Sequence, residues 1–183
     1  MGIESYVIPK GDLTLTQRMA YRSNAIDAAK SRAIALGIAT SKDGLDVRPF
    51  SSLTDAGAAL DQWNTAALAV VGTAYSVFQA IAAPILAANK LAVFFGVGIE
   101  TVPSPIGLLI FRSGAAAGNI RYQFDLEQLI NSEEIDGYFT EPIVYDPTRQ
   151  FAIQAVARIA TGAIARVQIK GFVIEPQGQI MAG

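Results

Sequence analysis

Apolar positions recur at two different periods along the chain, and the first period indicates a helix near the N-terminus. Thr14 followed three residues later by Gln17 is typical of a capping box, and Gly37 is placed to end the helix. Spacings of three and four join the apolar residues of one stripe, namely Leu15, Met19, Ile26, Ala29, Ala33 and Leu36. The pattern predicts an amphipathic helix over about residues 14–36, with a narrow, alanine-rich apolar stripe.

Three arginines border this stripe. Arg18, Arg22 and Arg32 fall within about 80° of one another on a helical wheel. Such a row is typical of a solvated helix edge that packs against its own domain or a neighbour. It also fits an arm that contacts nucleic acid or an acidic partner, although no aromatic residues interleave with the arginines. We therefore treat the three arginines as candidate arm contacts.

A continuous apolar character and then a two-residue period indicate strands in the second half of the chain. The runs Leu91–Ile99 and Ile106–Phe111 are typical of strands buried on both faces, and Gly96 in the first run indicates a bulge or close backbone packing. A half-exposed strand is predicted over 120–124, followed by a short helix that Asp125 caps and Gly137 closes. Two further strands, over 138–145 and 150–159, are joined by an Asp-Pro turn. The last predicted strand alternates over 166–173.

The stretch from Leu53 to Ala88 fits two interpretations. Its many alanines favour a helix, whereas Val70, Val71 and Tyr75 favour a strand. We favour strands from about Trp63 to Ile81 and leave the helical alternative open.

Short strands without a βαβ rhythm predict a mainly β fold, an antiparallel β-sandwich with an N-terminal α-helical arm. Arg48-Pro49 forces an extended conformation and follows a polar turn, so it is a natural boundary. The sequence thus predicts an arm over residues 1–49 and a sandwich domain over 50–183.

Composition indicates that some of the apolar surface meets other protein. Hydrophobic residues make up 51% of the 183 and charged residues only 16%, against about a quarter in typical soluble domains. Gly72, Gln79 and Pro84 interrupt the apolar stretch after residue 66, so we expect no membrane span. The first residues lack a basic and an apolar region, so we also expect no signal peptide.

Missing residue types argue against catalysis. The chain has no cysteine and no histidine, which removes disulfides, thiolate metal sites and the commonest general base. Asp125 and Glu127, with Glu133, Glu134 and Asp136, form the densest acidic cluster. The cluster fits a solvated helix face, a weak cation site or an acid–base pair, but it lacks the spacing of a calcium loop. We expect no cofactor, no metal and no enzymatic activity.

The layout resembles a known class of proteins. A mildly basic arm with a helix, carrying net charge +2 over residues 1–50, precedes a sandwich that ends in Val167-Gln-Ile-Lys-Gly-Phe-Val-Ile-Glu-Pro176. This arrangement resembles the single jelly-roll subunits of viral capsids and related virion proteins. The resemblance implies a jelly-roll-like sandwich that tiles a shell, and an arm that reaches beneath neighbouring subunits.

The leading functional hypothesis is accordingly a self-assembling structural subunit of a virion capsid or a related shell or tube. Its expected partners are copies of itself and other structural proteins, with nucleic acid as a further candidate through the arm. The alternative is a β-sandwich binding module that recognises a carbohydrate or peptide on a host surface. A third hypothesis is a hydrolase that uses the carboxylates of Asp125 and Glu127.

Overall fold

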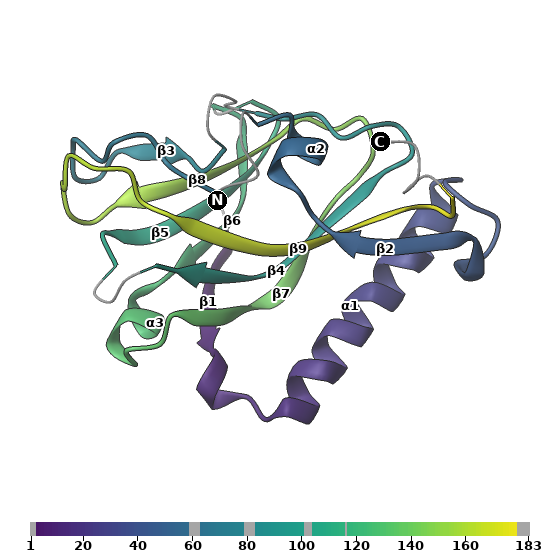
Figure 1. Ribbon diagram of the computed structural model, residues 1–183, viewed down its shortest axis with the longest axis horizontal. Helices are drawn as coiled ribbons and strands as arrows, with labels where there is room; N and C mark the ends of the chain where they lie inside the picture. The colour runs from purple at the N-terminus through teal and green to yellow at the C-terminus, as the bar shows by residue number, and fades with distance from the viewer. Residues whose placement is uncertain (1–2, 59–62, 79–82, 101–103, 116, 179–183) are drawn as a thin grey trace.

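Strands of one curled, mixed sheet form the body of the protein, and a long helix packs across one end of it (Figure 1). The computed structural model describes residues 3–58, 63–78, 83–100, 104–115 and 117–178. The strands are β1 (Ile3–Pro9), β2 (Leu45–Pro49), β3 (Ala74–Ser76), β4 (Leu91–Ile99), β5 (Ile106–Ser113), β6 (Asn119–Asp125), β7 (Asp136–Tyr145), β8 (Phe151–Ala157) and β9 (Val167–Pro176). The helices are α1 (Leu15–Ala35), α2 (Ser52–Ala56) and α3 (Glu127–Asn131), with 3₁₀ turns η1 (Lys10–Asp12) and η2 (Lys42–Gly44). The predicted mainly β fold with an N-terminal helix is confirmed.

The first strand joins the two halves of the sheet. The strand order is β2-β9-β4-β7-β1-β6-β5-β8-β3, and the sheet curls into a half-barrel around the main core. Residues 3–6 of β1 pair in parallel with β6, whereas Val7 to Pro9 pair antiparallel with β7. The other strand pairs are antiparallel. The interior position of β1 means that the N-terminal residues complete the sheet.

The long helix begins where the sequence predicts. Thr14 is the N-cap, its hydroxyl accepts a hydrogen bond from the Gln17 backbone N–H, and the Gln17 side chain accepts one from the Thr14 N–H. The predicted apolar stripe is only partly right, because the buried residues are Ala25, Ala29 and Ala33. They lie four apart, and their small side chains let the helix backbone approach β4 and β9 closely.

Both faces of the central strands are covered, as the apolar runs predict. In β4, Phe94 and Val97 face the main core, while Leu91 and Val93 face a second apolar cluster under α1. The pairing register shifts between Phe94 and Gly96, as expected of a bulge at this glycine. A Cβ at Gly96 would lie 2.5 Å from the Gly137 carbonyl oxygen, so only glycine fits.

Three predicted elements require correction. The strand expected over 63–81 is largely wrong, because β3 covers only Ala74–Ser76, the preceding segment is a loop, and residues 79–81 lie outside the described part. The short helix is real, but its N-cap is Leu126, and it ends at Asn131 while Gly137 belongs to β7. The strand expected to reach Ile159 ends at Ala157, because the next two N–H groups, those of Arg158 and Ile159, both donate to the Pro105 carbonyl before β5.

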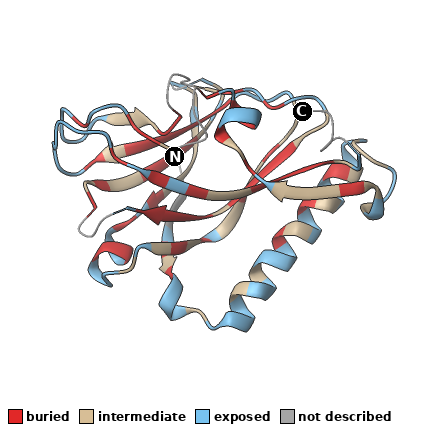
Figure 2. Ribbon diagram, in the orientation of Figure 1, coloured by how far each residue is buried: buried red, intermediate tan, exposed pale blue. Residues whose placement is uncertain are grey.

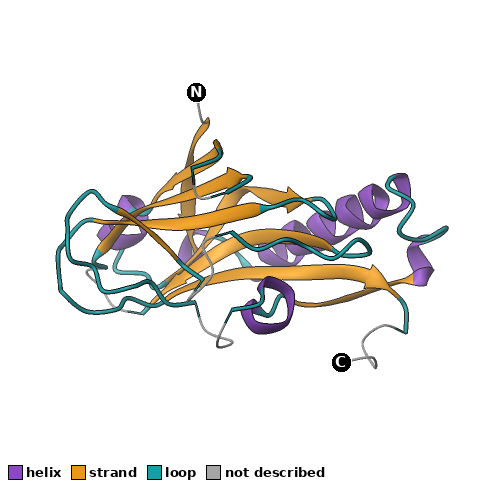
Figure 3. Cartoon of the chain, turned by 90° about the horizontal axis from the view of Figure 1, so that it is seen from above, coloured by secondary structure: helices purple, strands orange, loops and turns teal. Residues whose placement is uncertain are grey.

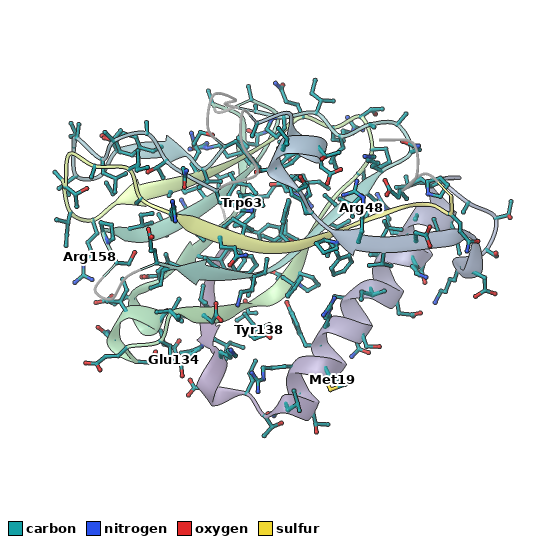
Figure 4. All side chains as sticks on the ribbon, viewed as in Figure 1. Met19, Arg48, Trp63, Glu134, Tyr138 and Arg158 are labelled. Atoms are coloured by element: carbon teal, nitrogen blue, oxygen red, sulfur yellow. The ribbon has the colours of Figure 1, made fainter. Side chains whose placement is uncertain are left out.

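A cluster of four charges ties β2 to the body of the sheet, and we call it the charged clasp. Arg48 of β2 donates to both carboxylate oxygens of Asp55, at 2.6 and 2.7 Å, and to Glu175 of β9 at 2.7 Å. Lys90 lies 3.1 Å from Asp55 and 3.5 Å from Glu175. Both carboxylate side chains are almost fully buried, so the clasp is a neutral, desolvated network (Figure 4).

The arm therefore contributes two strands to the sheet. β1 and β2 both lie in residues 1–49, and they flank α1 in the sequence. Lys30 of α1 also donates to the carbonyl oxygens of Lys42 and Leu45, which holds the helix against the start of β2. The division of the chain at residues 49 and 50 stays a prediction.

Candidate functional site

The N-terminal end of α1 leaves the sheet and presents apolar side chains to solvent. We call residues 15–20 the outer end of α1. Leu15 and Met19 lie one turn apart on it and are each 64% exposed (Figure 2). The contact that holds this region is an edge-to-face pair between Tyr21 and Tyr138 of β7, 6.0 Å between ring centroids. Figure 4 shows Met19 on this outer end, away from Tyr138.

The three predicted arginines occupy different environments. Arg32 donates to both carboxylate oxygens of Asp146, at 3.2 and 2.8 Å, and so binds the turn between β7 and β8. This hydrogen bond and the charge of Arg32 hold the pKa of Asp146 below its usual range. Arg22 is exposed and lines a hollow between α1 and the sheet, whereas Arg18 is half-buried. The structure does not gather them into one patch.

Two polar atoms beneath the outer end of α1 lack partners among the described residues. The Arg18 Nε and the Tyr21 hydroxyl are both buried and make no hydrogen bond there. Burial, with a smaller contribution from the nearby Glu141 carboxylate, raises the pKa of the Tyr21 hydroxyl. Unpaired buried polar atoms cost free energy, so this underside is incompletely satisfied in the single chain.

The acidic cluster is dispersed by the fold. Asp125 accepts a hydrogen bond from the Glu127 backbone N–H at 2.7 Å, and the two residues line a shallow hollow with Arg158. Asp136 points elsewhere, 2.6 Å from Lys170 and 3.5 Å from Lys10. Burial would raise the pKa of Asp136, but the hydrogen bond and charge of Lys170 outweigh it, and the pKa is lowered.

The other two acidic residues of the predicted cluster, Glu133 and Glu134, also lie apart from Asp125. Glu133 is exposed with a positive φ of 56°, and Glu134 lies against Gly11. Among the described residues, no three carboxylates come close enough together to hold a metal ion.

A groove of about 490 Å³ opens beside Trp63 and was not foreseen in the sequence. Trp63, Asn64, Gly98, Ile99, Glu100, Ile135, Asp136, Arg166 and Gln168 line it. Glu100 lies 3.6 Å from Arg166, and Asp136 is neutralised by Lys170, so the charged groups of the groove are paired. Trp63 also packs against Phe50 and Phe78, which fixes one wall in the core. The groove offers amide and carboxylate hydrogen-bonding groups with no net charge.

These residues come together only through the sheet. Trp63 lies in the loop after α2, Glu100 follows β4, Asp136 begins β7, and Gln168 lies at the start of β9. A single tryptophan in a segment without charge is the one sequence signal that marks this site. Pairing of β9 with β4 and of β4 with β7 supplies the rest.

Comparisons with known proteins give a distant likeness among solved structures. No family model matches the sequence, and no curated protein matches it. One structural match is VP2 in the crystal structure of the infectious bursal disease virus VP2 subviral particle, with a TM-score of 0.35 and 12% sequence identity. The match covers 75% of this chain and 34% of the VP2 chain. A TM-score this low does not establish a common fold, so the functional argument rests on the residues of this chain.

Within the described residues, no helix combines the length and apolar character needed to cross a membrane.

Proposed function

We propose that this protein is a non-enzymatic structural subunit that assembles with copies of itself, as in a virion capsid or a related shell or tube. The observation that carries the proposal is the outer end of α1. It places Leu15 and Met19 in solvent one turn apart, each 64% exposed. A neighbouring subunit that covers this end would bury both apolar side chains.

The rest of the surface supports the same proposal. Large apolar side chains are exposed at further positions, among them Tyr6, Leu53, Ile85 and Ile135. Solvent-exposed apolar groups scattered singly are common in monomers, but so many beside so little charge are typical of surfaces buried between subunits. The proposed location is therefore an assembled particle.

Native mass measured by light scattering, with negative-stain imaging, tests the proposal. We expect an assembly well above the 19.4 kDa of one chain. Leu15→Glu with Met19→Glu should reduce it to small species, because charge at an apolar contact costs free energy. Thr16→Glu with Ala20→Glu is the matched control, because it adds the same charge to exposed positions of the same turns. A wild-type monomer, or an assembly that the first pair leaves unchanged, contradicts the proposal.

The groove beside Trp63 favours a second candidate function, recognition of a carbohydrate. Its paired charges and its Asn64 and Gln168 amides suit a neutral ligand with many hydroxyl groups better than a charged one. A glycan array followed by calorimetry tests this. Gln168→Ala should weaken any binding about tenfold, while Gln150→Ala, outside the groove, should not change it. An array without hits removes this candidate.

A further inference from the structure

Two loops meet at the end of the sheet away from the C-terminal turns of α1 (Figure 3). We call residues 66–72 and 159–164 the apolar tip. All of these residues except Leu68 are exposed, and Val70, Val71 and Ile164 are each more than half exposed. Neither segment contains a charged residue. The tip is the place where large apolar side chains from two loops gather.

The tip is preformed, because the two loops are hydrogen-bonded to each other. The Leu68 N–H donates to the Ala163 carbonyl at 2.9 Å, and the Gly162 N–H donates to the Leu68 carbonyl at 3.0 Å. Leu68 is fully buried beneath them and anchors the first loop. Gly72 and Gly162 have φ values of 78° and 66°, a region that favours glycine, and they supply the turns.

Several backbone donors of the tip are satisfied within the protein. The Tyr75 hydroxyl accepts hydrogen bonds from the N–H groups of Ala69 and Val70, both at 3.0 Å. The Gly72 N–H donates to the Ala157 carbonyl at 2.8 Å, and the Ala163 N–H donates to the Thr161 hydroxyl. Internal pairing is the condition that an apolar medium imposes on backbone, because it offers no water to replace a missing partner.

Cations lie where the tip joins the sheet. Arg158 directly precedes the second loop (Figure 4), and Arg166 follows it in the sequence. Arg166 makes only an exposed pair with Glu100 at 3.6 Å, and Arg158 makes no ion pair among the described residues. Asp125 and Glu127 share a hollow with Arg158, so the base is not uniformly positive. Apolar contact therefore supplies most of the attraction, and the arginines add to it.

This arrangement fits a lipid surface better than a second copy of the chain. The groove beside Trp63 and the hollows beside Arg22, Arg149 and Arg158 are each lined by at least two charged side chains, so they do not match an apolar tip. A bilayer needs no matching hollow, and it presents phosphates just outside its apolar layer, at the level where the arginines would lie. We propose that the apolar tip inserts into the interface of a lipid bilayer, with Arg158 and Arg166 contacting lipid phosphates. The proposal does not rest on self-assembly.

Flotation of the full chain with vesicles tests this proposal. We expect binding to phosphatidylcholine vesicles, and stronger binding to an equal mixture of phosphatidylcholine and phosphatidylglycerol. Val71→Glu with Ile164→Glu should lower the bound fraction about tenfold or more. Leu53→Glu with Ile85→Glu is the matched control, because it adds the same charge at exposed apolar positions outside the tip and should leave binding unchanged.

A direct readout of insertion is the fluorescence of Val71→Trp after subtraction of the Trp63 signal. A blue shift with vesicles, and quenching by lipids brominated on their chains, would support insertion. Absence of wild-type flotation overturns the proposal. If the tip pair of substitutions instead lowers the native mass without any vesicle binding, the tip is an interface between copies. A monomer that floats would contradict the proposed assembly and leave this inference standing.

Discussion

Asp55 is the residue on which the charged clasp depends. Its side chain is fully buried and accepts hydrogen bonds from Arg48, from Lys90 and from the Ser51 backbone N–H. Burial alone would raise the pKa of Asp55, yet the hydrogen bonds from Arg48 and the backbone overcome this and lower it. The carboxylate is thus held in its charged form by partners that are themselves largely desolvated.

Asp55→Asn should lower the free energy of unfolding by about 3 kcal/mol, because two buried cations would then share Glu175 alone. Urea unfolding followed by circular dichroism measures the change. Asp27→Asn is the control, because Asp27 pairs with Lys42 in solvent and an exposed pair contributes about 0–1 kcal/mol. Equal effects of the two substitutions would show that the clasp does not stabilise the fold.

The dependence of the free energy of unfolding on pH follows from aspartates that are paired with cations in the folded protein. Asp55, Asp136 and Asp146 all have pKa values lowered in the folded protein. Their stabilisation is therefore complete above the unfolded pKa, about 3.9, and is lost as the pH falls through the folded values. Without histidine, the free energy of unfolding should be nearly flat between about pH 5 and 7 and fall below about pH 4. A titration step near pH 6 in urea unfolding would contradict this.

At the scale of elements, α1 is held by a seam of alanines. Ala29→Leu should lower the free energy of unfolding by about 1–3 kcal/mol, because Ala29 is fully buried against the strands and a larger side chain must push the helix away. Ala28→Leu changes the neighbouring, exposed position and should be close to neutral. Thermal unfolding of the two variants, compared with the wild type, measures the difference.

The sequence predicts the elements whose pattern is local. The capping box of Thr14 and Gln17 and the apolar run of β4 act over neighbouring residues, so both were found. The buried face of α1 depends on which side meets β4 and β9, and periodicity placed Leu15 and Met19 there although they are exposed. The stretch from residue 63 to 73 has strand-forming residues, but tertiary hydrogen bonds to the β8–β9 loop hold it as a loop.

The candidate sites were harder to predict than the elements. The charged clasp joins Arg48 to Glu175 across 127 positions, and the groove joins Trp63 to Gln168, so neither has a local pattern. Arg32 was singled out as an arm contact, and the structure pairs it with Asp146 of its own sheet. Whether the arginines touch a partner stays a prediction.

At the scale of the whole molecule, the interior position of β1 in the sheet determines whether the fold survives deletion of the N-terminal residues. Deleting residues 1–9 should abolish folding, because β6 and β7 would lose the strand between them and the curled sheet would be divided. Circular dichroism and native mass of the truncated chain measure this outcome. A truncated chain that keeps cooperative unfolding would show that residues 10–183 form the sheet without β1. Truncation is for this reason a poor test of assembly, and point substitutions on the outer end of α1 are preferable.

The interior position of β1 also determines when the sheet can form during translation. β1 is translated before its partners β6 and β7, which follow more than 100 residues later, judging from the register of Ile3 with Tyr122. β1 must therefore wait, unpaired, until both partners have left the ribosome, and such long-range pairing makes folding slow. We expect α1, an amphipathic helix that can form locally beside this unpaired strand, to shield it from wrong partners until the sheet closes.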